Sequence, residues 1–405
     1  MQRKSHTQRI EVGVATRVNG SRVRSPGGAL VAVLAALALV SGCSGASGGT
    51  GGGTDAQQGG EPSVSFEPGK GAEGVNPKDP IKLVAENGTL REVSLTNDED
   101  ERVEGELAED GSSWRATEPL GYDTTYEWSG ELVGSSGETT PVSGDFHTVA
   151  PEQVVRATIN PIDDKTVGIA MPISIKFDAP VENKAEVQRL LKVDTSEPVE
   201  GAWAWLNDQQ VDWRPKEYWP AHTEVSVDAP LYGVDYGAGK YGKADLTTNF
   251  DIGRAQVVKA EVDKHRLRVI RDGEQVASYP ASYGKPSNPD LHTHEGTYTV
   301  MAKHPVEIMD NPKYGYTDVK KKWAVRISNH GEFIHENEQN RANIGVRNTS
   351  HGCVNLTNAD AKEYFDSALI GDPVEVTGSG TQMPPRYAVY DWMLSWQQWQ
   401  QKSAL

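Results

Sequence analysis

Short runs in which hydrophobic and polar positions alternate cover most of this 405-residue chain. In residues 80–149 such runs, for example IKLVAE and TTYEWSGEL, are separated by turn-forming Asn-Gly and Ser-Gly pairs, and residues 154–253 repeat the pattern. Alternation of this kind indicates β-strands with one buried face, and many short strands joined by polar turns are typical of antiparallel sandwiches. We therefore predict two tandem sandwiches, at residues 78–150 and 151–253.

The two regions also share a repeated residue pattern. In each, a Trp-Arg pair stands twelve residues before a position in the next apolar run, and each region closes on a run that carries a phenylalanine. Repetition of this kind indicates one structural unit used twice. We interpret the pair as immunoglobulin-like domains without a disulfide. The repeated positions are Trp114, Tyr126 and Phe146 in the first region and Trp213, Val225 and Phe250 in the second.

Four tryptophans in the second region have two interpretations. Trp203, Trp205, Trp213 and Trp219 could stack on sugar rings, because aromatic faces do this well. They could equally alternate into the core of the sandwich, and we favour the core.

Residues 254–378 alternate in the same way but include one helical pattern. Asp272-Gly273 is a strong hairpin signal near the start. The run NADAKEYFDSAL has apolar residues at helical spacing, with Thr357 or Asn358 as its cap. Strands outnumber helices, so we predict a mainly β third domain.

The last residues, 379–405, contain Trp392, Trp396 and Trp399 at i, i+4 and i+7. This spacing predicts a helix with three indoles on one face, which we expect to dock onto the preceding domains.

The first residues have the pattern of a targeting segment. Residues 3–24 are basic, residues 29–40 are apolar and uncharged, and Val-Ser-Gly-Cys follows, ending at Cys43. The apolar run suits a signal peptide, and the Cys-terminated motif resembles a bacterial lipobox, which implies lipidation, as with palmitate, of Cys43. An ordinary secretory signal with an unrelated cysteine and a signal anchor that is left uncleaved are the alternatives. We expect residues 1–43 to be a signal peptide and the Gly- and Ser-rich residues 44–77 to be a flexible linker.

Charge and cysteine content exclude some classes of protein. The formal net charge is -17, which argues against nucleic-acid binding, because phosphate contacts need clustered Lys and Arg. The chain has only two cysteines. If Cys43 is lipidated and Cys353 is chemically active, none is left for a disulfide.

Candidate chemistry is concentrated in the stretch FIHENEQNRANIGVRNTSHGCVNL, from Phe333 to Leu356. It contains Cys353 with two imidazoles, His335 and His351, nearby in sequence. A thiol becomes a nucleophile near neutral pH when an imidazole takes its proton. Gly352 removes a Cβ where the backbone must approach a substrate carbonyl, and the amide of Cys353 could then help to hold an oxyanion.

The order of residues in this stretch resembles the signature of the L,D-transpeptidases, the family with a YkuD-type catalytic domain. A histidine, a later glycine and an SHGC-[any]-N block occur in the family's order. The tandem domains before it resemble those of mycobacterial-type members. The resemblance implies a mainly β fold: two immunoglobulin-like sandwiches, a β-rich catalytic domain and a short C-terminal helical extension.

By the same resemblance, Cys353 is the nucleophile and His335 the general base. Ser350, His351, Gly352 and Asn355 would support the pocket and its hydrogen bonds. Glu336 follows the base, where a small hydroxyl residue is often found in the family, and its role could lie in its backbone carbonyl or in its carboxylate. The insertion before the histidine strand would form a lid, in which Met309, Tyr314 and Tyr316 line the substrate channel.

The implied function is formation of 3→3 crosslinks between donor and acceptor stem peptides of peptidoglycan, through a thioester, in cell-wall biogenesis. The implied partners are these stems, the membrane through the N-terminal lipid, and carbapenem-type β-lactams as covalent inhibitors. The location would be the outer face of the cytoplasmic membrane. We expect no cofactor and no metal, although His292, His294 and His304 could be imagined as ligands.

Two other functions remain open from the sequence. A papain-like cysteine endopeptidase of peptidoglycan also uses Cys and His, but its cysteine usually precedes its histidine. A non-catalytic lipoprotein that binds the wall through its immunoglobulin-like domains is the second.

Overall fold

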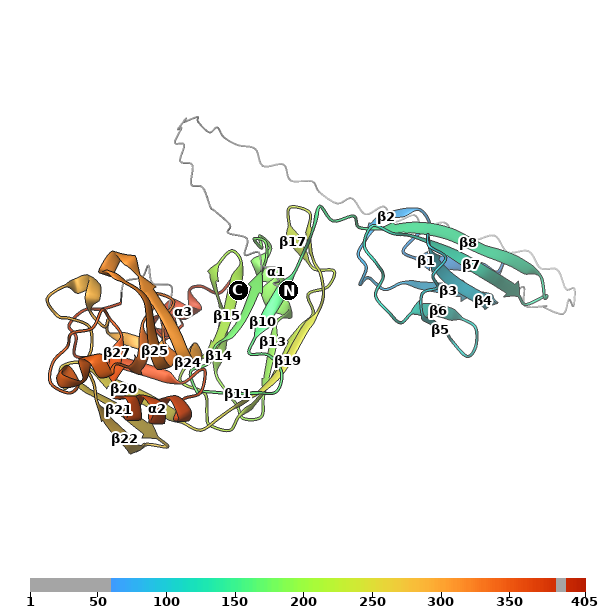
Figure 1. Ribbon diagram of the computed structural model, residues 1–405. Coiled ribbons are helices and arrows are strands. Elements are labelled where there is room, and N and C mark those ends of the chain that lie inside the picture. Colours follow the sequence, from blue (N-terminus) through green and yellow to red (C-terminus); the bar gives the residue numbers. More distant parts are fainter. Residues whose placement is uncertain (1–59, 384–390) are drawn as a thin grey trace, which may run out of the picture. The chain divides into compact units, whose positions relative to one another are not determined.

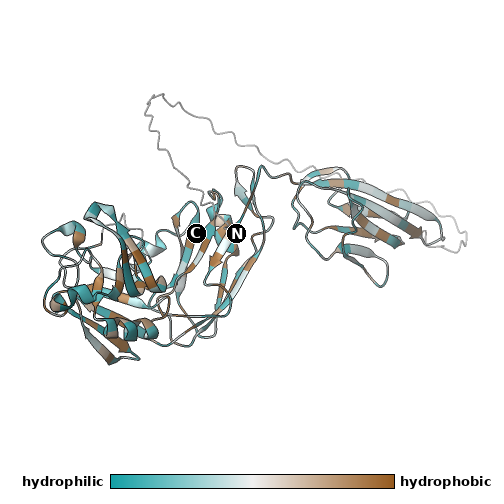
Figure 2. Cartoon of the chain, in the orientation of Figure 1, coloured by the Kyte–Doolittle hydropathy of each residue, from teal (hydrophilic) through white to brown (hydrophobic). Residues whose placement is uncertain are grey.

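The computed structural model describes residues 60–383 and 391–405, which form mainly β-sheets (Figure 1). The signal-peptide prediction and Cys43 therefore lie outside the described residues. Hydrophobic and hydrophilic residues alternate along many strands in Figure 2, as the sequence pattern predicts. The predicted fold class, two immunoglobulin-like sandwiches followed by a β-rich domain and a short helical extension, is confirmed.

The first sandwich pairs two four-stranded sheets around a core that includes Trp114, Trp128 and Phe146. One sheet has the order β1-β3-β6-β5 and the other β2-β8-β7-β4. The strands are β1 (Ser63–Glu67), β2 (Ala72–Val75), β3 (Lys82–Glu86), β4 (Gly88–Asn97), β5 (Gly105–Leu107), β6 (Ser113–Ala116), β7 (Thr125–Gly134) and β8 (Thr139–Thr148).

These strands correct one boundary. We expected a flexible linker as far as residue 77, but β1 and β2 lie within that range. β1 pairs with β3, and its Val64 and Phe66 pack against the core, while β2 pairs with β8. The alternation in SVSFE is a strand pattern that the surrounding glycines obscure.

The second sandwich has two four-stranded sheets, a small third sheet and one short helix, α1 (Lys184–Leu190). The sheet orders are β10-β12-β15-β14, β11-β19-β16-β13 and β17-β18-β9. The strands are β9 (Gln153–Val155), β10 (Ala157–Asn160), β11 (Lys165–Val167), β12 (Ile173–Phe177), β13 (Lys192–Thr195), β14 (Gly201–Asn207), β15 (Gln210–Pro215), β16 (Glu224–Ala229), β17 (Asp235–Gly237), β18 (Lys240–Gly242) and β19 (Leu246–Ile252).

The residues of the repeated pattern occupy equivalent positions in the two sandwiches. Tyr126 lies opposite Phe146, and Val225 lies opposite Phe250. The tryptophans of the second sandwich belong to its core, because Trp203, Trp205, Trp213 and Trp219 are all buried. Their stacking on sugars is therefore ruled out in this conformation.

The third domain contains a five-stranded sheet, β22-β21-β20-β28-β23, and a four-stranded sheet, β24-β25-β26-β27. Asp272 and Gly273 form the predicted hairpin turn, with φ angles of 51° and 83°. α2 packs on the second sheet, and the Thr357 side chain caps it by accepting from the amide of Asp360. The elements are β20 (Gln256–Glu261), β21 (Arg266–Arg271), β22 (Glu274–Pro280), β23 (Gly296–Thr299), β24 (Ala302–Asn311), β25 (Tyr316–Arg326), β26 (Phe333–Glu336), β27 (Val354–Leu356), β28 (Pro373–Thr377) and α2 (Asn358–Ser367), with 3-10 turns η1 (Pro289–Leu291), η2 (Pro312–Tyr314) and η3 (Glu338–Asn343).

The C-terminal helix is shorter than expected. α3 covers only Trp396–Gln400, because Ser395 begins it with a capping box, and Trp392 lies before it in a turn. The prediction of three indoles on one helical face is therefore wrong. The three indoles nevertheless surround the Arg214 guanidinium at 4.6, 5.4 and 4.9 Å.

Candidate active site

Two short parallel strands place the residues singled out in the sequence next to one another. β26 carries His335 and β27 carries Asn355, and the two residues are direct partners in the register. Cys353 immediately precedes β27 and follows the turn that begins at Ser350. Parallel strands need a connection that returns the chain to the same end, and η3 lies within that connection. The pairing of β26 with β27 therefore brings the two ends of the polar segment between them, near His335 and Cys353, close together.

The turn before β27 is held by side chains on both sides. Ser350 Oγ donates to the carbonyl of Cys353 at 2.6 Å and accepts from the amide of Gly352 at 3.3 Å. Thr293 Oγ1 donates to the carbonyl of Gly352 at 2.7 Å. Gly352 has φ 116°, which only glycine adopts without strain. These contacts fix where the Cys353 side chain leaves the backbone.

The thiol of Cys353 is protonated in this site. Its Sγ donates to the carbonyl of Gly331 at 3.7 Å. Desolvation raises the pKa of Cys353 to about 12, although a hydrogen bond from the amide of Phe333 opposes the effect. At neutral pH the sulfur therefore needs a base to become a thiolate.

His335 is a buried, neutral imidazole whose tautomer follows from its partners. Only 3% of the residue is exposed, and burial lowers its pKa to about 4. Its Nδ1 lies 2.6 Å from the carbonyl of Glu336, and since a carbonyl can only accept, Nδ1 carries the proton. Nε2 is thus left with a lone pair.

The contact with Glu336 decides between the two roles considered for that residue. The backbone carbonyl of Glu336 orients His335, whereas the carboxylate faces elsewhere. The carboxylate oxygens accept from the backbone amides of Lys322 at 3.3 Å and Glu338 at 3.2 Å.

A series of hydrogen bonds between side-chain amides leads to His335 Nε2. A lysine at its start fixes the direction in which each amide donates. The ammonium of Lys321 can only donate, and it donates to Asn337 Oδ1 at 2.8 Å. Asn337 Nδ2 then donates to Asn355 Oδ1 at 2.7 Å. Asn355 must therefore turn its Nδ2 toward His335 Nε2, which lies 3.4 Å away. Asn340 Nδ2 also donates to Asn355 Oδ1, at 3.3 Å.

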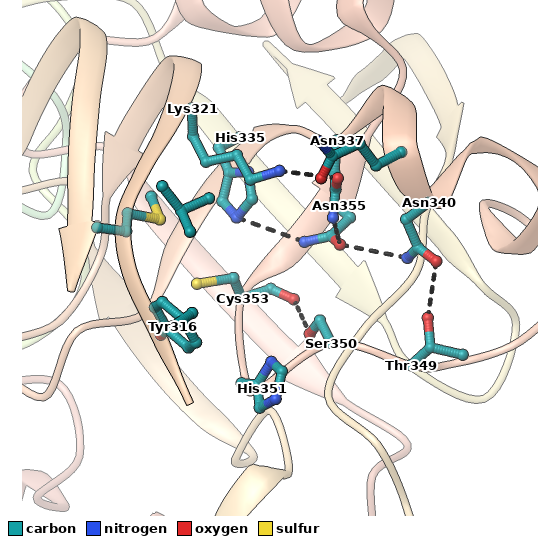
Figure 3. A pocket seen from close by; sticks show the side chains of 13 residues that line it. Tyr316, Lys321, His335, Asn337, Asn340, Thr349, Ser350, His351, Cys353 and Asn355 are labelled. Atoms are coloured by element: carbon teal, nitrogen blue, oxygen red, sulfur yellow. Dashed lines mark hydrogen bonds between the residues drawn. The ribbon is translucent and has the colours of Figure 1, made fainter. Parts of the chain in front are cut away.

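These side chains surround a cavity of about 370 Å³ (Figure 3). His335 and Cys353 both point into it, with Asn355 and Asn337 on one side. Lys321 and Met309 also line this cavity.

A second cavity, of about 330 Å³, meets the first at Cys353 and differs in charge. Asp290, Glu307, Asp310 and Glu332 line it, together with Arg326, His330 and His351.

The segment expected to form a lid is a hairpin made of β24, η2 and β25. Met309 and Tyr316 line both cavities, and Tyr314 lines the second. The rings of Tyr314 and Tyr316 lie 5.7 and 5.4 Å from that of His351. The hairpin therefore contacts the SHGC turn directly.

The three histidines that the sequence offered as metal ligands each contact different residues. His292 contacts Thr381 Oγ1 and the carbonyl of Pro286. His294 lies 3.9 Å from Glu332, and His304 lies 4.0 Å from Glu307. Within residues 60–383 and 391–405, no group of three or more His, Cys, Asp or Glu side chains could hold a metal ion.

Sequence reasoning missed Lys321, Asn337, Asn340 and Thr293. Lys321 is the middle residue of a Lys-Lys-Lys run, which normally indicates a solvated surface. Alternation along a strand could have singled it out, because successive side chains point to opposite faces and the middle lysine therefore faces away from its two neighbours. The two asparagines lay in a segment interpreted only as a polar loop.

Residues 255–376 match the L,D-transpeptidase catalytic domain family YkuD, and residues 72–235 match the bacterial Ig domain family Big_10. L,D-transpeptidase 5 of Mycobacterium tuberculosis is 45% identical over 85% of this chain and 77% of its own length. The chain belongs to the L,D-transpeptidase family.

The chain is also similar to two further proteins. L,D-transpeptidase 2 of M. tuberculosis is 35% identical to this L,D-transpeptidase, over 85% of each chain. A solved structure of the LD transpeptidase LdtMt1 in complex with imipenem is 33% identical, covers 56% of this chain and 99% of its own, and has a TM-score of 0.48. The family assignment makes the chain an enzyme, an L,D-transpeptidase.

Proposed function

We propose that this enzyme forms 3→3 crosslinks between peptidoglycan stem peptides, with Cys353 as nucleophile and His335 as general base. One observation carries the proposal: the lone pair of His335 Nε2 and the thiol of Cys353 face the same cavity. Family membership supports the reaction class, and the geometry supports the two roles.

In the first half-reaction, Cys353 Sγ attacks the carbonyl that joins the diamino acid to the terminal D-alanine of a donor stem. The S–H proton passes to His335 Nε2 as the S–C bond forms. The C–N bond then breaks, and the imidazolium returns the proton to the amine of the leaving D-alanine. A thiol with a raised pKa and an imidazole with a lowered pKa disfavour a resting ion pair, so the proton moves only during attack.

The turn that begins at Ser350 supports the tetrahedral intermediate. The amide of Cys353 is the proposed oxyanion donor, and Gly352 leaves space for the substrate: a Cβ built there would have its nearest neighbour 3.5 Å away. Ser350 holds the turn, and His351 forms part of the wall with Tyr314 and Tyr316.

In the second half-reaction, the side-chain amine of an acceptor stem attacks the thioester and releases the thiol. The acidic second cavity, with Asp290, Glu307 and Asp310, suits a group that arrives as an ammonium. The ammonium first loses one proton to solvent, because only the free amine can attack. The amine then gives a second proton to His335 as the new amide bond forms, and His335 passes this proton to the departing sulfur of Cys353.

The same thiol is the proposed target of carbapenem-type β-lactams. The relative solved with imipenem supports this extension. Attack of Cys353 Sγ on the β-lactam carbonyl opens the ring, so the whole drug remains attached as one adduct.

A wall crosslinking enzyme is an exported protein, and we propose that a lipid on Cys43 anchors it at the outer face of the cytoplasmic membrane. The signal-peptide and lipobox pattern of residues 1–43 supports this. In residues 60–383 and 391–405, no helix is long and apolar enough to cross a membrane. Mass spectrometry of the N-terminal peptide after expression in a lipoprotein-processing host tests it, because Cys43→Ala must then lack the lipid.

The test of the proposed function is a transfer assay with a donor tetrapeptide and an acceptor peptide that carries a free side-chain amine. The wild type should release D-alanine and form the crosslinked dimer. Cys353→Ala should form none, and His335→Ala should fall by about 100-fold or more, because general base catalysis contributes roughly that factor. His304→Ala is the control, with its side chain partly exposed.

The products also separate the alternatives. A papain-like endopeptidase would release free stems without joining them, and a protein that only binds the wall would leave both peptides unchanged. Crosslinking by Cys353→Ala would contradict the proposed role of this thiol.

A further inference from the structure

Lys321 places a buried ammonium group in the wall of the cavity that contains His335 and Cys353. The residue is 8% exposed, whereas Lys320 and Lys322 beside it on β25 are exposed. Alternation along the strand therefore turns one lysine of the three inward. Nothing in the proposed reaction uses this charge.

The ammonium is only partly satisfied by the protein. It has three N–H donors, and one of them goes to Asn337 Oδ1 at 2.8 Å. Across residues 60–383 and 391–405, no carboxylate lies within the 4.0 Å of an ion pair with its Nζ. The carboxylate of the nearby Glu336 accepts from two backbone amides instead.

A buried cation without an anionic partner is costly, because it loses hydration and gains little in return. Burial accordingly lowers the pKa of Lys321. An anion that entered the cavity would supply the missing partner, and its attraction to the ammonium would be stronger there than in water.

The charge of the two cavities indicates where such an anion would bind. The second cavity has four carboxyl groups in its wall, from Asp290, Glu307, Asp310 and Glu332, against the single guanidinium of Arg326, and this excess of negative charge would repel a carboxylate. In the first cavity, Asn337 and Asn340 are amides and Lys321 carries a cation.

We propose that Lys321 binds a carboxylate of the donor stem in the first cavity and selects donors that carry it. This inference rests on the proposed function, because it concerns the substrate of the same site. The carboxylate belongs either to the terminal D-alanine or to the side chain of the diamino acid. Both present the same chemistry to an ammonium, and the experiment distinguishes them.

The test compares three donor tetrapeptides on the full chain: one with both carboxylates free, one with a C-terminal carboxamide, and one with the side-chain carboxyl amidated. The readout is kcat/KM for D-amino-acid or D-alaninamide release. With the wild type, one of the amidated donors should react about 10- to 100-fold more slowly, the usual loss when a charged hydrogen bond is removed. The slow donor identifies the carboxylate.

Lys321→Met should bring the ratio of the free-acid rate to the slow-amide rate close to 1, because any effect that passes through Asn337 is common to both donors. Lys321→Arg should retain part of the preference. Lys320→Met, which removes the same charge from the outer face of β25, should behave as the wild type. If Lys321 only positioned Asn337, Lys321→Met would slow acid and amide donors equally, and the inference would be overturned.

The wild type alone gives a second check that does not depend on the folding of a variant. If it processes all three donors at one rate, the carboxylate subsite is wrong and the transpeptidase function stands. If it forms a thioester with none of them, the proposed function and this inference both fail.

Discussion

His335 and Cys353 are held in their uncharged forms by burial, and this sets how the enzyme must work. Desolvation lowers the pKa of His335 to about 4 and raises that of Cys353 to about 12. The thiol donates to Gly331, not to the imidazole. In the proposed reaction, proton transfer from Cys353 to His335 therefore becomes favourable only as the substrate carbonyl arrives.

Replacement of His335 should change how the stability of the catalytic domain depends on pH. The pKa falls from 6.5 to about 4 on folding, so the unfolded chain binds the proton first as the pH drops. Stability should decline between pH 6.5 and 4, by about 3 kcal/mol from this residue. His335→Asn should lack that part of the decline.

Hydrogen exchange of the β26 and β27 amides at pH 7 and pH 4 measures the difference. His304→Asn, which changes a partly exposed histidine, should follow the wild type. An equal decline in wild type and His335→Asn would show that His335 is not buried in its neutral form.

The amide chain predicts the effect of reversing its polarity. In Asn337→Asp, a carboxylate accepts from Lys321 and can no longer donate to Asn355, so the Asn355 amide should flip. Its oxygen would then face His335 Nε2 and favour a proton there, which raises the pKa of His335 by about 1. NMR titration of the imidazole measures the change.

Gln339→Glu is the matched control, because it adds the same charge at the rim of the same cavity without a place in the chain. If both variants raised the pKa of His335 equally, charge alone would explain the effect and the chain would have no defined polarity.

The sequence could single out Cys353 and His335 because a histidine, a later glycine and an SHGC-[any]-N block occur together in one order that resembles the L,D-transpeptidase signature. It could not single out Lys321, Asn337 or Asn340. Lysine and asparagine are common on surfaces, and their importance here comes from a strand register and from Lys321 being an obligate donor. Both are properties of contacts that no local pattern contains.

The turn before β27 controls where the thiol lies. Gly352→Ala would not collide with a neighbour, since the nearest atom to a Cβ lies 3.5 Å away, but its φ of 116° is unfavourable for alanine. We expect a loss of about 1–3 kcal/mol in stability or a shift of the turn that removes transfer activity. Thermal unfolding and the transfer assay measure the two effects.

Gly273→Ala is the matched control, at φ 83° with open space around it, in a hairpin remote from the SHGC turn. It should lose stability and keep activity. Full activity in Gly352→Ala would show that the turn does not set the position of Cys353.

Patterns of alternation predicted the strands well where polar turns separate them. They failed where composition obscured them, as at β1 and β2 inside a Gly-rich tract. The C-terminal tryptophans show the opposite error: helical spacing was present, but the Ser395 cap begins the helix after Trp392. The three indoles come together because each contacts the guanidinium of Arg214, which belongs to the second sandwich.

Arg214 links the second sandwich to the C-terminal residues. Besides the three indoles, its guanidinium donates to the carbonyl of Leu394 at 3.0 Å. Trp392 and Trp399 donate to the carbonyls of Ala170 and Ala202 at 2.8 and 2.9 Å. Tyr218 of the same sandwich packs against Trp392 with its ring tilted by 59°, and it donates to Glu375 of the catalytic domain at 3.1 Å. Met393 of the same segment packs against the core of the catalytic domain, so the tail contacts both domains.

Arg214→Met should release this tail. We expect a loss of about 3 kcal/mol from the cation–π contacts and the charged hydrogen bond together. Limited proteolysis should then cut within residues 391–405 sooner than in the wild type. Arg156→Met, at an exposed arginine of the same sandwich, should leave the cleavage rate unchanged. Equal rates in Arg214→Met and wild type would mean that the other contacts suffice.

The most direct measurement of the central claim is intact mass spectrometry of the full chain mixed with a donor tetrapeptide in the absence of an acceptor. The account predicts one adduct with the mass of the donor minus D-alanine, located by peptide mapping on Cys353 and absent from Cys353→Ala. An adduct on another residue, or the same adduct on Cys353→Ala, would contradict it.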